Sequence, residues 1–276
     1  MRAILLPTDF SKNSINAIHY AVKLFELDEC DFYILNVQKA SQFISDDLMS
    51  VSTSATIYNT LVDAAKKSII NIISQIEKSY NNENHTFHSL VDYDNFIDSI
   101  NQNSKLYGID LIVMGTKGAT GFEKVLFGSN TVHVMQRCDL PVLAIPEGCK
   151  FKKLDVIAFT TSFSSTYAME NLETLNYLIN VYKAKLNLVH VITEPDFEEE
   201  LYSNLVFFQS NFINMAFDRI ILKENDIYKT IHKYIIKNDI KMISMFRKKH
   251  SFVERLFTRH TLETFGFNID VPFLVM

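Results

Sequence analysis

The most informative segment of this 276-residue chain is MGTKGATGFEKVLFGS, residues 114–129. It places Gly115, Gly118 and the pair Gly128-Ser129 directly after the apolar run Ile109 to Met114. A strand that ends in glycine lets the backbone approach a phosphate group, because no Cβ stands in the way. A helix that begins at Ser129 directs its first N–H groups and its positive dipole end at the same anion. The spacing therefore predicts a phosphate-binding loop between a strand and a helix.

Strand and helix patterns alternate on both sides of this loop. Short apolar runs predict five strands, and stretches with helical spacing or capping residues separate them. Asp9 or Ser11 is expected to cap the first helix. The alternation is typical of parallel strands with right-handed crossovers and helices on both faces of the sheet. The expected strands are Ala3–Leu6, Asp31–Val37, His85–Val91, Asp110–Met114 and Pro141–Ile145, and the expected helices include Leu61–Ile76, Asp94–Tyr107 and Ser129–Arg137.

A second candidate site segment is the turn Pro7-Thr8-Asp9, which follows the first expected strand. In open α/β sheets, ligands bind beyond the carboxyl ends of the strands, where the strand order reverses. The turn and the glycine loop both fall at carboxyl ends. One pocket is therefore expected to use both segments.

The order of elements restarts after a linker, Glu147–Lys153. The segment Leu6–Ser11 is echoed by Phe159–Ser164, and Asp139–Leu143 is echoed by Asp270–Leu274. We interpret the chain as two tandem copies of one α/β unit, with domains at residues 1–146 and 153–276.

The second copy lacks the phosphate-binding pattern. When Met245 is aligned with Met114, bulky or branched residues replace the glycines, and Ser162 replaces Asp9. Side chains at these positions would fill the space that phosphates need. The second domain is therefore not expected to bind a nucleotide in the same way. The replacements are Phe246 for Gly115, Lys249 for Gly118, Thr258 for Gly128 and Arg259 for Ser129.

Composition restricts the classes of function. The formal net charge of -5 argues against general nucleic-acid binding, which requires a basic surface. The chain has no run of about 18 apolar residues, so no membrane-spanning helix is expected. Three widely spaced cysteines have neither metal-binding nor redox spacing and indicate reduced thiols. The expected location is the cytoplasm.

These motifs resemble the universal stress protein family. The resemblance rests on Pro7–Ser11, on Met114–Gly118 with Gly128-Ser129, and on Asp139–Leu143. It covers residues 1–146 closely and the rest through the degenerate echo. It implies two Rossmann-like domains of the adenine nucleotide alpha hydrolase-like type, each with a five-stranded parallel sheet in the order 3-2-1-4-5. It also implies ATP binding and pairing through the fifth strands, as an intramolecular pseudo-dimer or in a homodimer.

The resemblance assigns roles to residues of the first domain. The Pro7-Thr8-Asp9 turn would contact the adenosine part, and Asp9 would help to position Mg²⁺ with the ATP. Val37 would contact adenine through its backbone. We add Lys117 because of its charge and position. The residues expected to line the ribose and phosphates are Met114, Gly115, Lys117, Gly118, Gly128, Ser129 and Asn130.

The sequence leaves more than one function open. The preferred interpretation is an ATP-binding stress-response or signalling module. The alternatives are an ATP-hydrolysing enzyme of the same superfamily, for which no catalytic base is evident, and a structural interaction protein with a vestigial pocket. The basic residues from Arg247 to Arg259 form either a solvated loop or a site for another anion or an acidic partner. His85 and His88 lie three apart on a strand, so they are expected to face opposite sides and not to share a metal.

Overall fold

The computed structural model describes residues 1–38, 51–116, 128–161, 163, 167–192, 198–221, 227–247 and 270–276. For residues 51–59, 191, 198–200, 221 and 227–229 it describes the backbone alone. Contacts divide the chain into two compact units. Unit 1 comprises Met1–Gly121 with Gly128–Leu140, and unit 2 comprises Phe122–Phe127 with Pro141–Met276.

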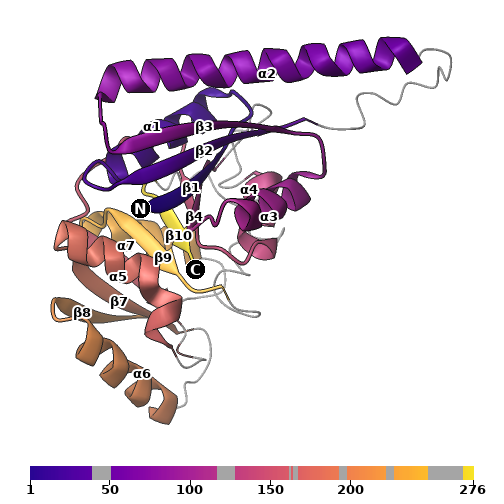
Figure 1. Ribbon diagram of the computed structural model, residues 1–276. Helices are drawn as coiled ribbons and strands as arrows, with labels where there is room; N and C mark the ends of the chain where they lie inside the picture. Colours follow the sequence, from indigo (N-terminus) through magenta and orange to yellow (C-terminus); the bar gives the residue numbers. More distant parts are fainter. Residues whose placement is uncertain are drawn as a thin grey trace. The chain divides into compact units, whose positions relative to one another are not determined.

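Unit 1 is a parallel sheet with flanking helices (Figure 1). Its strands lie in the order β3-β2-β1-β4. They are β1 (Arg2–Pro7), β2 (Cys30–Val37), β3 (His85–Asp92) and β4 (Leu111–Gly115), and the helices are α1 (Lys12–Leu24), α2 (Val51–Tyr80), α3 (Phe96–Leu106) and α4 (Ser129–Arg137).

The core of unit 1 follows the apolar spacing of its helices. Helix α1 contacts β1 and β4, α2 contacts β3, and α3 contacts α4. The buried residues of α1 include Ile18 and Val22, and the chain buries Phe25 just after the helix. The long α2, the purple helix in Figure 1, buries one narrow stripe at helical spacing. This stripe consists of Ala65, Ile69, Ile72 and Ile76.

Unit 2 repeats the strand order of unit 1 and adds the fifth parallel strand. Its five parallel strands lie in the order β8-β7-β6-β9-β10, and β5 pairs with β10 in the antiparallel direction. The strands are β5 (Val142–Ile145), β6 (Val156–Thr161), β7 (Lys185–Ile192), β8 (Met215–Ile221), β9 (Met242–Met245) and β10 (Phe273–Val275), and the helices are the 3-10 helix η2 (Met169–Leu172), α5 (Glu173–Tyr182), α6 (Glu198–Asn211) and α7 (Ile227–Lys237).

The α/β fold predicted from the sequence is confirmed. Each strand expected in the first copy is present within one residue of its expected ends, and α4 has the expected bounds. The order of β6 to β10 is the expected 3-2-1-4-5. The contacts assign β5 to unit 2 because it pairs with β10, whereas the sequence interpretation ends the first domain at residue 146. That boundary stays a prediction.

Every helix in the described part of the chain is too short or too polar to cross a lipid bilayer.

Candidate functional site

The candidate site lies where three neighbouring strands of unit 1 end. β1 is flanked by β2 and β4, with Pro7 paired to Leu35 and Leu5 paired to Ile112. Because the strands are parallel, the residues that follow β1 lie at the same edge as the ends of β2 and β4. The chain passes from β1 to β2 on one side and reaches β4 on the other. This is the reversal of strand order at which ligands bind in open α/β sheets.

Thr8 shapes the turn that follows β1. Its side chain is buried, and its Oγ1 accepts a hydrogen bond from the amide of Phe10 at 3.0 Å. The same hydroxyl bonds Ser14 Oγ at 2.9 Å. The turn places Phe10 at a φ of 63°, which non-glycine residues seldom adopt. Because the Thr8 hydroxyl bonds within the turn, its observed role is to hold the turn between β1 and α1 in shape.

Asp9 projects from this turn and is exposed. Its Oδ1 accepts a hydrogen bond from the amide of Ser11 at 3.1 Å. Ser11, and not Asp9, is the N-cap of α1, since its hydroxyl accepts from the amide of Ser14 at 3.2 Å. Of the two residues that the sequence offered as the cap, the structure selects Ser11. The carboxylate of Asp9 therefore faces solvent at the edge of the sheet.

Asn36 is a site residue that the sequence interpretation missed. It is buried near the end of β2, and its Nδ2 donates to the carbonyl of Thr8 at 2.7 Å. Its Oδ1 accepts from Gln38 Nε2 at 2.5 Å. A buried amide costs free energy unless it is hydrogen-bonded, so Asn36 fixes the Thr8 backbone relative to β2. An asparagine within the apolar strand Cys30–Val37 was the available sign of this role.

Gly115 ends β4 and packs closely against α1. A Cβ at this position would lie 2.8 Å from Asn13 Nδ2 and 3.1 Å from the Asn13 carbonyl oxygen. A larger residue would therefore force the Asn13 side chain to move and the α1 backbone to shift slightly. The packing of α1 on β4 thus favours a glycine here, in addition to any requirement that a phosphate would impose. The sequence alone did not reveal this contact.

The start of α4 is attached to the end of β4. The amide of Gly128 donates to the carbonyl of Thr116 at 2.6 Å, and Thr131 Oγ1 donates to the carbonyl of Gly115 at 2.9 Å. The N-cap of α4 is Gly128, which provides no side-chain cap. The first backbone bond of the helix runs from the Val132 amide to the Gly128 carbonyl, 3.1 Å. The preceding amides, those of Ser129 and Asn130 among them, form the helix end that attracts anions.

The remaining predicted site residues divide into three groups. Pro7 and Met114 are buried within the ends of β1 and β4, and Val37 is half-buried at the end of β2. Ser129 and Asn130 are exposed in the first turn of α4. Lys117 and Gly118 lie outside the described residues. So does the basic segment of the second copy from Lys248 to Arg259, including Lys249 and Thr258.

The two histidines of β3 have structural contacts on different sides of the strand. His85 bonds the carbonyl of Phe25 at 3.0 Å, and His88 pairs with Asp31 at 2.9 Å and stacks on Tyr33. Among the described residues, no group of three or more His, Cys, Asp or Glu side chains has the arrangement of a metal site.

Comparison with known proteins gives this edge a family context. The family model described as Universal stress protein family matches residues 1–146. The chain belongs to the universal stress protein family. A universal stress protein of Methanocaldococcus jannaschii is 26% identical over 144 residues, which are 52% of this chain and 81% of that protein. The family model covers the half of the chain that contains the glycine loop and the Pro7-Thr8-Asp9 turn.

Two solved structures resemble the chain over both units. A universal stress protein from Archaeoglobus fulgidus has a TM-score of 0.71 and 18% identity, with 99% of this chain and 95% of that chain covered. A putative universal stress protein from Pseudomonas aeruginosa has a TM-score of 0.59 and 11% identity, with 100% and 93% covered. At these identities the likeness supports the fold alone. The fold of the family therefore extends over unit 2, whose motifs are degenerate.

Proposed function

We propose that unit 1 binds ATP at the carboxyl edge of β1 and β4 and that the protein acts as a nucleotide-responsive binding module. The observation that carries the proposal is the reversal of strand order between these strands. The exposed carboxylate of Asp9 lies after β1, and the start of α4 follows β4. Gly128 is the N-cap of α4 and provides no side-chain cap. A carboxylate suits a hydrated Mg²⁺, and a helix N-terminus suits phosphate.

The residues present fit this ligand unevenly. The α4 terminus fits an anion because its first amides precede the first intrahelical bond. Gly115 offers no free space on its Cβ side, where Asn13 lies, so it would act through its backbone. When bound, Mg²⁺ would neutralise phosphate charge, and the Asp9 carboxylate would hold it directly or through a water. Lys117 and Gly118 would complete the loop, as the sequence pattern predicts.

In this proposal, unit 2 does not bind a nucleotide in the way that unit 1 does. It provides a surface for pairing with the first copy or with a partner. The antiparallel pairing of β5 with β10 supports an intramolecular form of the fifth-strand pairing that the family resemblance implies. Further association of two chains and a cytoplasmic location stay predictions.

The test is calorimetric titration with ATP, with and without Mg²⁺, of the wild-type protein and of Asp9→Asn. Asparagine keeps an acceptor for the Ser11 amide but removes the charge. We expect Asp9→Asn to weaken Mg-ATP binding about tenfold, because a charge-assisted contact is lost. Without Mg²⁺ we expect Asp9→Asn to bind ATP at least as tightly as the wild type, since the carboxylate repels the phosphates.

Asp110→Asn is the matched control. Asp110 is an exposed aspartate at the opposite edge of the same sheet, and its Oδ2 also accepts a backbone amide, that of Ala3, at 2.9 Å. This variant should bind like the wild type. Gly118→Val should abolish binding in the presence of Mg²⁺. Nucleotide binding that survived Gly118→Val would refute the placement, and steady ADP production in the same samples would favour an enzyme over a binding module.

A further inference from the structure

Unit 1 has a cavity at the end of its strands opposite to the candidate site. It has a volume of about 240 Å³ and lies between the carboxyl ends of α1 and α2 and the start of β3. Because His85 is the first residue of β3 and Asp92 the last, the cavity is separated from the carboxyl edge by the length of the strand. It takes no part in the proposed nucleotide site. The lining residues are Val22, Ile76, Glu77, Tyr80, Asn81, Asn82, Glu83, His85 and Phe87.

The inner wall of the cavity is apolar and aromatic. Val22 and Ile76 are buried, and Phe87 and Tyr80 contribute rings. A cavity of about 150 Å³ is enough to hold a benzene molecule. The space is therefore large enough for a ligand with one ring or a branched alkyl body and a short polar group.

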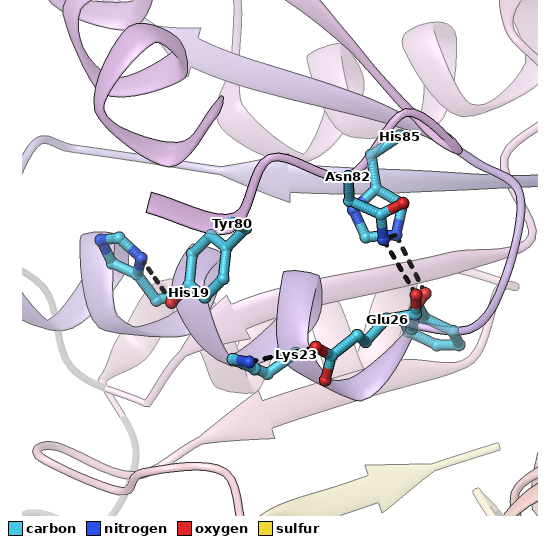
Figure 2. A network of polar contacts seen from close by, with 7 residues as sticks. His19, Lys23, Glu26, Tyr80, Asn82 and His85 are labelled. Carbon is cyan, nitrogen blue, oxygen red and sulfur yellow. Dashed lines mark hydrogen bonds and ion pairs between the residues drawn. The ribbon is translucent and has the colours of Figure 1, made fainter. Parts of the chain in front are cut away.

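The charge of the lining has one sign. Among the described residues around the cavity, both ionised side chains are carboxylates, those of Glu77 and Glu83, and both are exposed at its rim. Lys23 is nearby, but its ammonium lies 3.2 Å from Glu26 and 5.2 Å from the centre of the Tyr80 ring (Figure 2). Lys23 is thus paired with Glu26 and already lies over the Tyr80 ring, so the negative charge of the lining comes from Glu77 and Glu83. The Phe87 ring is the second aromatic surface that can attract a cation.

His85 adds a buried acceptor to the wall. The side chain is 9% exposed, and its Nε2 lies 3.0 Å from the carbonyl oxygen of Phe25 and 3.2 Å from Asn82 Nδ2. Because a carbonyl only accepts, the tautomer with the proton on Nε2 satisfies the shorter of the two contacts. Asn82 is held beside it by donating from Nδ2 to the carbonyl of Glu26 at 2.9 Å (Figure 2). In that tautomer Nδ1 is an acceptor, and this buried atom has no hydrogen-bond partner among the described residues.

The walls are held in place without a ligand. His19 on α1 bonds the Tyr80 hydroxyl through Nδ1 at 3.0 Å, which joins the two helices beside the cavity. Burial lowers the pKa of His19, so its ring is neutral at pH 7 and adds no positive charge. A preformed cavity loses little conformational entropy on binding.

We propose that this cavity binds a small organic ammonium ion with an aromatic or branched alkyl body. The body packs on Val22, Ile76 and Phe87, and the ammonium group lies at the rim between Glu77 and Glu83. The paired features, a ring-lined interior and a rim with two carboxylates, select this class over neutral and anionic molecules of the same shape.

The experiment uses the full chain and three probes of matched shape: phenethylammonium, 2-phenylethanol and phenylacetate. Binding is followed by NMR through the methyl groups of Val22 and Ile76, which report on the cavity itself. We expect phenethylammonium to shift both methyl signals, 2-phenylethanol to bind about fivefold more weakly, and phenylacetate not to bind. The affinity for phenethylammonium should fall as NaCl is added, because the rim carboxylates are exposed.

The double variant Glu77→Gln/Glu83→Gln should lower the affinity for phenethylammonium about fivefold and leave that for 2-phenylethanol unchanged. Asp63→Asn is the matched control, because it removes one carboxylate from the same helix about 20 Å from Glu77. Equal binding of phenethylammonium and 2-phenylethanol, equal weakening by Asp63→Asn, or unshifted methyl signals at millimolar phenethylammonium would each overturn the proposal. The salt titration of the wild type tests, independently of the variants, how much the rim carboxylates contribute to the affinity for phenethylammonium.

Discussion

The carboxyl edges of the two units have the same type of turn after their first strand. They differ in the side chains that pack beside that turn. In unit 1, Phe10 has a φ of 63° and donates to Thr8 Oγ1 at 3.0 Å. In unit 2, Phe163 has a φ of 51° and donates to Thr161 Oγ1 at 2.9 Å. The turn is therefore retained although the residues around it have diverged.

The difference begins six residues after each threonine. Thr8 bonds the hydroxyl of Ser14, whereas Thr161 bonds the hydroxyl of Tyr167. The ring of Tyr167 lies 5.8 Å from that of Phe246, the residue that aligns with Gly115. It also lies 5.2 Å from the ring of Phe208. The same hydrogen bond thus has a small polar partner in unit 1 and belongs to an aromatic cluster in unit 2.

This contrast shows that the same turn is compatible with small polar neighbours in unit 1 and with an aromatic cluster in unit 2. The prediction that bulky residues occupy the second edge agrees with the ring contacts of Phe246. Because aromatic rings have more surface to bury than serine or glycine, we infer that unit 2 gains packing where unit 1 keeps polar groups. The three predictions below test this contrast between the edges.

The largest effect on stability is expected at the centre of the aromatic cluster. Phe208 is fully buried and contacts the rings of Phe159, Tyr167 and Phe212. Phe208→Ala should lower the free energy of unfolding by about 3–5 kcal/mol, measured by urea unfolding followed with circular dichroism. The neighbouring Phe207→Ala is the control and should cost clearly less, since Phe207 is only half-buried. Equal losses would show that the cluster has no special role.

A smaller effect is expected at the corresponding edge of unit 1. Gly115→Ala should destabilise the protein by about 1–3 kcal/mol, because the new Cβ would lie 2.8 Å from Asn13 Nδ2. Combining it with Asn13→Ala should recover part of the loss, because the contact with the Asn13 carbonyl oxygen remains. Strictly additive losses in this double-mutant cycle would contradict the close packing of α1 on β4.

The smallest effects are expected at the hydrogen bond that both edges share. Ser14→Ala and Tyr167→Phe each remove a hydroxyl partner from a threonine, so each should cost about 1 kcal/mol in urea unfolding. Ser14→Ala should cost slightly more, because Ser14 Oγ also donates to the Ser11 carbonyl at 3.0 Å. Tyr167→Ser, which introduces the residue of the first copy, should cost more because it also removes the ring from the cluster. A large loss for Ser14→Ala with none for Tyr167→Phe would break the equivalence of the two turns.

Local patterns were enough to predict most of the elements. The apolar runs ending at Leu6, Val37 and Met114 became β1, β2 and β4, because short buried strands between turn residues leave few alternatives. The repeat was also visible, since Phe10 bonds Thr8 and Phe163 bonds Thr161 in the same way. The candidate site could be placed at a strand edge on these grounds, although its ligand contacts stay predictions.

The contacts that build the site could not be predicted in this way. Asn13 and Gly115 are about a hundred positions apart, and only the packing of α1 on β4 brings them together. Asn36 bonds the carbonyl of Thr8 because β2 lies beside β1. Spacing along the chain contains no information about either neighbour.

Periodicity, turn residues and glycine spacing are local properties of the chain, and they were enough to predict the α/β class, the repeat and the family. The three-dimensional packing was needed to find that Ser11 caps α1, that the Thr8 hydroxyl bonds within the turn, and that Gly115 makes room for Asn13. It also decided that α1, α2 and β3 enclose a cavity with carboxylates at its rim. These features depend on distances between distant segments, which are set by how buried side chains pack and which hydrogen bonds they satisfy.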